Sequence, residues 1–336
     1  MSALCLILIL LAPQSPAELS EQAQQLAEKK QFDEAEHLWR QALRASPRFF
    51  PALFNLGLLF YSQQKFGGAK EMLSQAVLAE PKDYNAHYLL GAVYSKLENR
   101  DDALRQWRIA LDLRPDNPRL MEIMIVEYEK GRYFTEEANL AQRVLALKPD
   151  DLNVYLLTIK ACQDTGDYAA ALAVARQAAG KFPESARANF EYGFHLQKTG
   201  KATEALSYLQ TAMTLDPQYE EPPFYYGDLL LRQGKEQEAI PYLRRAIQNR
   251  GDYIPARVEL ARALMKAGKL QDASAELERT VELEPRNPQP HLLLSQIYFR
   301  LGDESRAAQE KETSLRLRRE NPEILEARQG RPFPDR

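Results

Sequence analysis

The chain has 336 residues, 27% of them charged, and a formal net charge of -3. This length exceeds that of one ordinary domain, so it indicates either several domains or a repeat array. The balanced charge excludes a protein that binds DNA or RNA through a concentrated basic field, and we expect no nucleic acid among the partners.

The chain begins with a short apolar segment, residues 3–12, which is too short to cross a bilayer as a helix of about 20 residues. It is typical of the core of a secretory signal peptide. Ser15 and Ala17 supply small residues for cleavage after Ala17. We therefore expect residues 1–17 to be removed, export to the periplasm or the outside, and no stable membrane span after processing. Residues 1–17 contain no Lys or Arg, so an uncleaved segment on a cytoplasmic or membrane-tethered protein stays open as the alternative.

After this segment, several residue types recur with a period of 34 residues. Prolines stand at Pro47, Pro81, Pro115, Pro149, Pro183, Pro217 and Pro285, and Gly251 fills the remaining slot. Small residues stand twelve positions earlier, at Ala35, Ala69, Ala103, Ala171, Ala205, Ala239 and Ala273. A glycine column holds Gly166, Gly200, Gly234, Gly268 and Gly302. Such self-similarity at a fixed period indicates an array of repeated structural units.

Each interval between prolines contains two stretches with helical apolar periodicity. The glycine column ends the first helix, and the proline column ends the second. Small residues such as Gly57 and Ala69 let the helices approach closely, while Trp107 and Leu209 fill the space between pairs. Helices this short are marginal alone in water, so stability must come from stacking of several repeats.

The residues from His87 to Tyr94, followed by Ala103, Trp107 and Pro115, resemble the tetratricopeptide repeat. The resemblance covers about nine tandem copies in residues 18–319 and implies an all-α, right-handed superhelical solenoid of helix–turn–helix units. Predicted copies begin near Pro16, Phe50, Tyr84, Pro118, Leu152, Ala186, Glu220, Ile254 and Pro288. The fourth copy departs from the pattern, with Met124-Ile125 where Leu-Gly is usual.

No motif for chemistry is present in the sequence. The histidines His37, His87, His195 and His291 form no metal-ligand pattern, and no phosphate-binding loop or nucleophile elbow occurs. Cys162 reads as a small buried hydrophobe. We therefore expect no enzyme activity, no catalytic residues, no metal and no cofactor.

In the tetratricopeptide family the first helices line the inner, concave face, where partners bind. Carried onto this sequence, the inner positions are partly aromatic. The predicted partner-binding residues are Phe54, Tyr61, Tyr88, Phe190, Phe194, Phe224 and Tyr225. Aromatic side chains are favoured anchors in peptide recognition. The alternative is that these rings pack between neighbouring first helices.

A second inner-face column, the thirteenth position of each repeat, is basic in six copies. It holds Lys96, Lys130, Lys198, Arg232, Lys266 and Arg300. These residues either form a cationic row that suits an acidic partner or complement the helix dipole with local charge compensation.

The sequence thus predicts a non-enzymatic protein–protein interaction scaffold that binds a protein or peptide on the concave face. The alternatives are a targeting or adaptor subunit of an enzyme complex and a self-associating structural protein. Residues 320–336 read as a polar, partly disordered tail.

Overall fold

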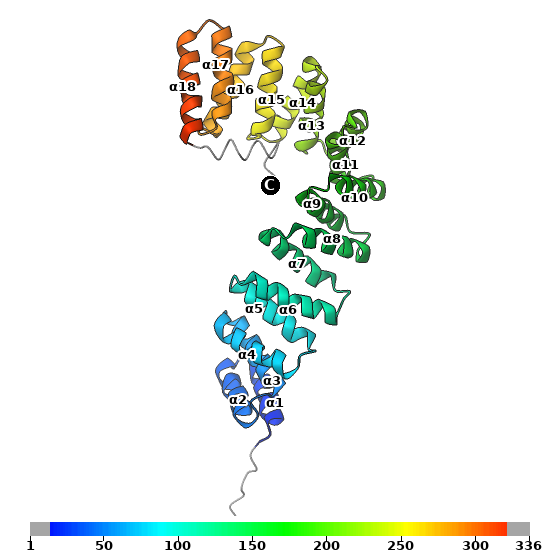
Figure 1. Cartoon of the computed structure of the whole chain (residues 1–336), viewed down its shortest axis with the longest axis vertical. Coiled ribbons are helices and arrows are strands. Elements are labelled where there is room, and N and C mark those ends of the chain that lie inside the picture. Colours follow the sequence, from blue (N-terminus) through cyan, green and yellow to red (C-terminus); the bar gives the residue numbers. More distant parts are fainter. Residues whose placement is uncertain (1–13, 321–336) are drawn as a thin grey trace, which may run out of the picture. The chain divides into compact units, whose positions relative to one another are not determined.

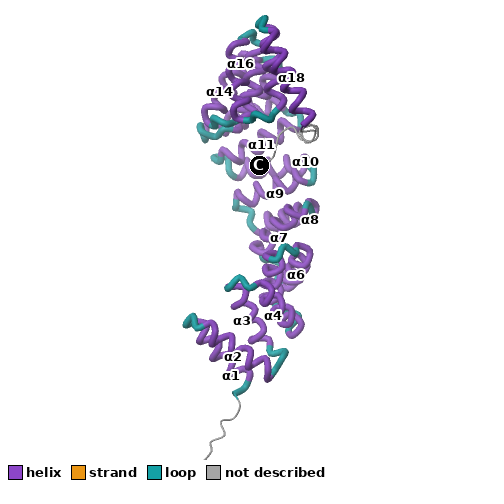
Figure 2. Tube along the Cα trace, turned by 90° about the vertical axis from the view of Figure 1, so that its left-hand side faces the viewer, coloured by secondary structure: helices purple, strands orange, loops and turns teal. Residues whose placement is uncertain are grey.

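The computed structural model describes residues 14–320, and within this range the chain folds into eighteen helices and no strand (Figures 1 and 2). The helices follow one another in the order of the sequence and form antiparallel pairs. The all-α fold predicted from the 34-residue period is confirmed. The signal-peptide prediction rests mainly on residues 1–13 and the tail prediction on residues 321–336, which lie outside the described range.

The first helices of the nine pairs in this range are α1 (Pro16–Glu28), α3 (Phe50–Ser62), α5 (Tyr84–Lys96), α7 (Pro118–Gly131), α9 (Leu152–Asp164), α11 (Ala186–Lys198), α13 (Glu221–Arg232), α15 (Ile254–Lys266) and α17 (Pro288–Arg300). The second helices are α2 (Phe32–Ala45), α4 (Phe66–Ala79), α6 (Arg100–Leu113), α8 (Phe134–Leu147), α10 (Tyr168–Lys181), α12 (Ala202–Leu215), α14 (Glu236–Asn249), α16 (Leu270–Leu283) and α18 (Glu304–Glu320). Every first helix except α13 begins at the residue predicted from the period, and α13 begins one residue later.

The start of α1 bears on the predicted cleavage after Ala17. The helix begins at Pro16, and Ser15 caps it by accepting a hydrogen bond from the backbone N–H of Glu18, whose side chain bonds back to Ser15. Such a capping box satisfies two backbone donors at a helix start. A cut after Ala17 would therefore remove the cap and the first two residues of the helix.

The described residues form two compact units, divided after residue 149, with α1–α8 in the first and α9–α18 in the second. In each unit a helix contacts the next one along the chain. First helices of neighbouring repeats also contact one another, as α1 does α3, α3 does α5, α9 does α11, α11 does α13 and α13 does α15. The first helices therefore share one side of each unit, which we call its inner face.

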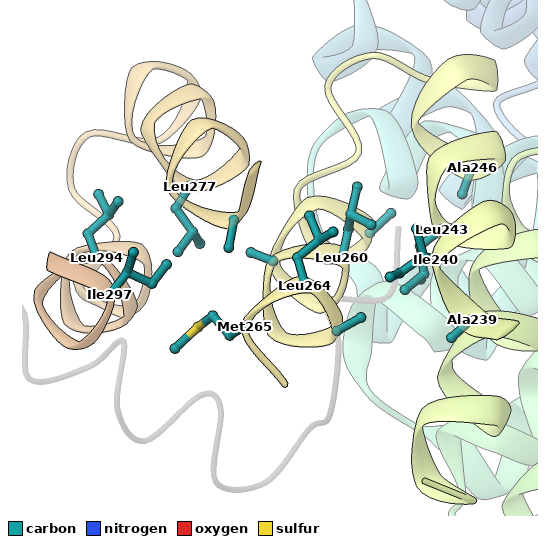
Figure 3. Close-up of a cluster of buried hydrophobic side chains, with 14 of the residues drawn as sticks. Ala239, Ile240, Leu243, Ala246, Leu260, Leu264, Met265, Leu277, Leu294 and Ile297 are labelled. Atoms are coloured by element: carbon teal, nitrogen blue, oxygen red, sulfur yellow. The ribbon is translucent and has the colours of Figure 1, made fainter. Parts of the chain in front are cut away.

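The apolar core lies between the helices, with one cluster of buried side chains through α1–α5 in the first unit and another through α13–α18 in the second. In the second unit, Leu243 of α14, Leu260 and Leu264 of α15, Leu277 of α16 and Leu294 of α17 are all buried and lie between their helices (Figure 3). No repeat encloses its own apolar face, so neighbouring repeats supply each other's burial.

The turn between the two helices of a repeat needs one residue in the left-handed conformation. In the second unit this residue is always glycine, with φ between 74° and 81° at Gly166, Gly200, Gly234, Gly268 and Gly302. In the first unit the same slot holds Lys30, Gln64, Glu98 and Arg132, with φ between 58° and 62°. The turn thus has the same left-handed backbone conformation in the repeats that have no glycine at this position.

Candidate protein-interaction surface

The seven aromatic residues predicted on the inner face fall into two groups. Phe54, Tyr61 and Tyr88 in the first unit and Phe194 and Tyr225 in the second are half-buried, so part of each ring faces solvent. Phe190 and Phe224 are buried, and Phe224 is only 1% exposed. The prediction that Phe190 and Phe224 contact a partner directly is therefore wrong. Both are core residues, and for them the alternative that the rings pack between helices applies.

Two tyrosines in loops explain this burial. Tyr219 lies edge-on to Phe190, with ring centroids 5.2 Å apart, and Tyr253 lies 5.1 Å from Phe224. Both tyrosines occupy the slot just before a first helix, where Asp83 and Asn117 stand in the first unit as helix caps. An aromatic residue in this slot covers the ring of the preceding repeat, and the sequence contained this signal.

The inner face of the first unit differs, because it carries a row of apolar residues that is open to solvent. Leu58 of α3 and Val126 of α7 occupy the ninth position of their repeats and are 44% and 46% exposed. The same position on α5, between them in sequence, holds the small, half-buried Ala92. We call the set Phe54, Leu58, Tyr61, Tyr88, Ala92 and Val126 the apolar strip. Leu58 and Val126 were missed from the sequence because only aromatic residues were selected there.

Neighbouring rings hold the aromatic members of the apolar strip in place. Phe54 stacks on Phe50 with centroids 5.7 Å apart, and Tyr88 stacks on Tyr84 at 5.9 Å. The guanidinium group of Arg114 lies over the Tyr84 ring, 4.1 Å from the ring centroid. Rings held in this way lose little conformational freedom when a partner covers them.

The inner face of the second unit is charged instead. Arg187 pairs with Glu191 on α11 at 2.9 Å, Arg232 with Asp228 on α13 at 2.8 Å, and Arg262 with Glu259 on α15 at 3.1 Å. Burial raises the pKa of Glu191 above its usual range, against the opposing effect of Arg187. The two units thus offer partners two different chemistries.

The cationic row at the thirteenth position is largely engaged by neighbours. Lys130 pairs with Glu127 at 3.0 Å and Lys266 with Glu236 at 3.1 Å, and Arg300 donates to the backbone carbonyl of Met265. Arg232 is in the pair with Asp228 described above. For Lys130, Lys266 and Arg300 these contacts favour the alternative of local compensation, whereas Arg232 is much the more exposed member of its pair.

His195 and Cys162 are buried in the second unit and take part in its packing. The His195 ring lies 3.0 Å, Nε2 to Nε2, from the side-chain amide of Gln163, and its Nδ1 has no hydrogen-bond partner among the described residues. Burial and the nearby Lys198 lower the pKa of His195 to about 4. Cys162 is buried, as its sequence position predicts.

The other buried histidines tie helices together. His87 bonds to the Gln106 side chain at 2.7 Å and to the Pro81 carbonyl at 3.0 Å, and His291 lies 2.6 Å from Glu310. Within residues 14–320, no group of three or more His, Cys, Asp or Glu side chains is arranged to hold a metal ion. None of the helices in this range is both long and apolar enough to cross a membrane.

Comparison with known families agrees with the helix-pair geometry. Family models described as tetratricopeptide repeat match residues 26–93, 159–220 and 230–297. These segments cover repeats in both units. The chain belongs to the tetratricopeptide repeat family.

Solved structures show the same architecture. A crystal structure of PilW, described as a widely conserved type IV pilus biogenesis factor, is 25% identical with a TM-score of 0.52, over 61% of this chain and 94% of that chain. The structure of Naa15/Naa10 bound to HypK-THB is 15% identical with a TM-score of 0.56, over 90% of this chain and 63% of that chain. A crystal structure of MamA is 19% identical with a TM-score of 0.46, over 48% of this chain and 95% of that chain. No curated protein matches the sequence.

Proposed function

We propose that this chain is a non-enzymatic protein-interaction scaffold and that the apolar strip of its first unit binds an apolar stretch of a partner polypeptide. The observation that carries the proposal is the exposure of Leu58 and Val126 in register, with only the methyl group of Ala92 at the position between them. Exposed apolar surface on a stable scaffold commonly marks an interaction site.

The strip supports this role energetically. Fully burying one large apolar side chain is worth about 1.5–3 kcal/mol relative to leaving it in water, and Leu58 and Val126, which are 44% and 46% exposed, contribute about half of that each. The small Ala92 leaves room for a partner side chain beside Tyr88. None of the six strip residues is charged, so the contacting segment of the partner is apolar rather than ionic.

The similarity to PilW, a type IV pilus biogenesis factor, supports a partner that is a component of a larger protein assembly. This similarity reaches 25% identity over 61% of the chain, so it bears on the kind of process rather than on the identity of the partner.

The test replaces Ala92 by Arg. The long charged side chain would lie over the strip, and Arg has a high helix propensity. The matched control is Ile109→Arg on α6, an exposed apolar residue of a second helix. Partners captured from the native compartment and measured by mass spectrometry should be retained by wild type and by Ile109→Arg. They should fall at least about tenfold with Ala92→Arg, since an uncompensated charge opposes apolar contact. Equal capture of partners by all three proteins would show that the apolar strip does not bind them.

The same capture separates the alternatives. A co-purifying enzyme would make the chain the adaptor of an enzyme complex. Recovery of only a second copy of the chain, with a mass that rises with concentration in light scattering, would indicate self-association.

We also propose export, on the strength of the apolar residues 3–12 and the small Ser15 and Ala17. Because Ser15 caps α1, a cut that keeps Ser15 would preserve the first helix better than the predicted cut after Ala17. The mass of the protein from its native compartment decides this, since an intact Met1 on a cytosolic protein would contradict export.

A further inference from the structure

The inner face of the second unit carries one ion pair on each of three successive first helices. Arg187–Glu191 lies on α11, Arg232–Asp228 on α13 and Arg262–Glu259 on α15. In each pair the partners stand three or four residues apart on the same helix, which is the spacing that brings side chains together.

In all three pairs the carboxylate is the more buried member and the guanidinium the more exposed one. The Glu191 side chain is 9% exposed and that of Arg187 is 49% exposed, and the other two pairs show the same order. A molecule that approaches this face therefore meets guanidinium groups before carboxylates.

The pairs on α13 and α15 are neighbours, and α11 contacts the pair on α13 through Gln197. The Gln197 side chain of α11 donates a hydrogen bond of 2.7 Å to Oδ2 of Asp228 on α13. Burial raises the pKa of Glu259 on α15, and Arg262, Asp228 and Arg232 are near enough to act on it as well. Arg232 and Arg262 are thus neighbours, whereas Arg187 stands near the start of α11, about 15 Å along the helix from Gln197.

Each arginine keeps donors for a ligand. A guanidinium has five N–H groups. Arg187 uses its Nε and one terminal nitrogen on Glu191, Arg232 uses its Nε on Asp228, and Arg262 uses one terminal nitrogen on Glu259. The buried carboxylates also restrict the arginines, which lowers the entropy lost when a ligand binds.

We propose that the inner face of the second unit is a second binding surface, which takes an acidic polypeptide segment through carboxylate contacts to Arg187, Arg232 and Arg262. Charge complementarity to the outermost groups selects this occupant over a basic one. Arginine also matches carboxylates through two parallel hydrogen bonds.

Helix spacing indicates the pattern of the acidic residues. Packed helices lie about 10 Å apart, and an extended chain advances about 3.3 Å per residue. Acidic residues three or four positions apart therefore suit Arg232 and Arg262. A further acidic residue about five or six positions away suits Arg187, which stands ten residues, or about 15 Å, before Gln197 on its helix. This surface lies in the other unit from the apolar strip and is tested without it.

The test uses the full chain and a fluorescent peptide of repeated Glu-Gly-Ser, with a Lys-Gly-Ser peptide of the same length for comparison. Fluorescence anisotropy at low salt, where exposed charges are least screened, should show the Glu peptide binding at least about tenfold more tightly than the Lys peptide. Preference for the Lys peptide, equal binding or no binding of the Glu peptide would overturn the proposal, because the buried carboxylates or the net charge would then dominate.

The variant neutralises the three pairs together, with Arg187→Gln and Glu191→Gln, Arg232→Gln and Asp228→Asn, and Arg262→Gln and Glu259→Gln. It leaves no buried carboxylate without its arginine and keeps the net charge. The control carries Arg176→Gln, Arg244→Gln and Arg279→Gln, which are exposed residues of second helices and whose loss makes the protein more negative.

The Glu peptide should lose at least about tenfold in affinity with the neutralised variant, and less than about threefold with the control. A control that weakens binding as much as the variant would overturn the proposal, since only the general field would then matter. If the triple variant fails to fold by circular dichroism, the Arg232→Gln/Asp228→Asn pair alone should cost about threefold, and an unchanged affinity would overturn the proposal. The Ala92→Arg variant, which is altered in the first unit, should bind the Glu peptide with unchanged affinity. This expectation holds whether or not the apolar strip binds a partner, so the two proposals can fail separately.

Discussion

Gly91 of α5 lies directly against Trp107 of α6, and a Cβ atom at Gly91 would come within 2.4 Å of the indole. The same relation joins Gly57 to Leu73 at 2.6 Å and Gly227 to Leu243 at 2.8 Å. In the fourth and fifth repeats the sizes are reversed, with buried Ile125 and Ile159 on the first helix and buried Ala141 and Ala175 at the partner position on the second. These five repeats therefore each place one large and one small residue at this contact, and the unusual fourth repeat follows the same rule.

This exchange of volume predicts a coupling between the two positions. Gly57→Ile should destabilise the protein by about 1–3 kcal/mol through overpacking against Leu73. Leu73→Ala should cost about 2–5 kcal/mol through the cavity it leaves. The double variant, which reproduces the arrangement of the fourth repeat, should be at least about 1 kcal/mol more stable than the sum of the singles. Urea unfolding measures the cycle, and additive effects would show that the two side chains do not share one space.

The left-handed turn residue predicts opposite effects in the two units. Gln64→Gly and Glu98→Gly in the first unit should each stabilise by about 0.5–1 kcal/mol, because glycine adopts positive φ without a steric penalty. Gly200→Gln in the second unit should destabilise by about 1–2 kcal/mol, although a Cβ there would meet nothing within 4 Å. Melting temperatures give the comparison. A loss of stability in Gln64→Gly would mean that its side chain contributes more than its backbone conformation costs.

His195 predicts a dependence of stability on pH. Its folded-state pKa is lowered to about 4 from 6.5, so below pH 6.5 the unfolded chain binds a proton that the folded chain does not. Stability should therefore fall as pH drops from 6.5 towards 4, by about 3 kcal/mol in total for this residue alone. His195→Gln cannot titrate and should lose less stability than wild type between pH 7.5 and pH 5. The comparison cancels the buried glutamates, whose raised pKa values act in the opposite direction, and an equal loss in both proteins would exclude His195 as the cause.

The sequence predicted the positions of the helices better than the exposure of their side chains. The proline and alanine columns placed the helix pairs, and eight of nine first helices begin at the expected residue. The exposure of the side chain at the fifth position of a repeat depends on the residue just before the next repeat. For Phe54 this residue is Asp83, and for Phe224 it is Tyr253, which covers the ring. A column on one helix does not contain that information. In the ion pairs on α11, α13 and α15 the carboxylate is more buried than the arginine. The sequence could not predict this order, because it depends on the neighbouring helices and no single helix shows which charge faces outward.

The central claim is that a partner lies on the inner face of the first unit. A photo-crosslinking residue in place of Leu58 or Val126 tests it most directly, with the same residue in place of Ile109 on α6 as the control. Irradiation of the captured complex should join the partner to positions 58 and 126 and leave position 109 unlinked. A crosslink from position 109 alone, or none from positions 58 and 126 in a protein that still holds its partner, would contradict the claim.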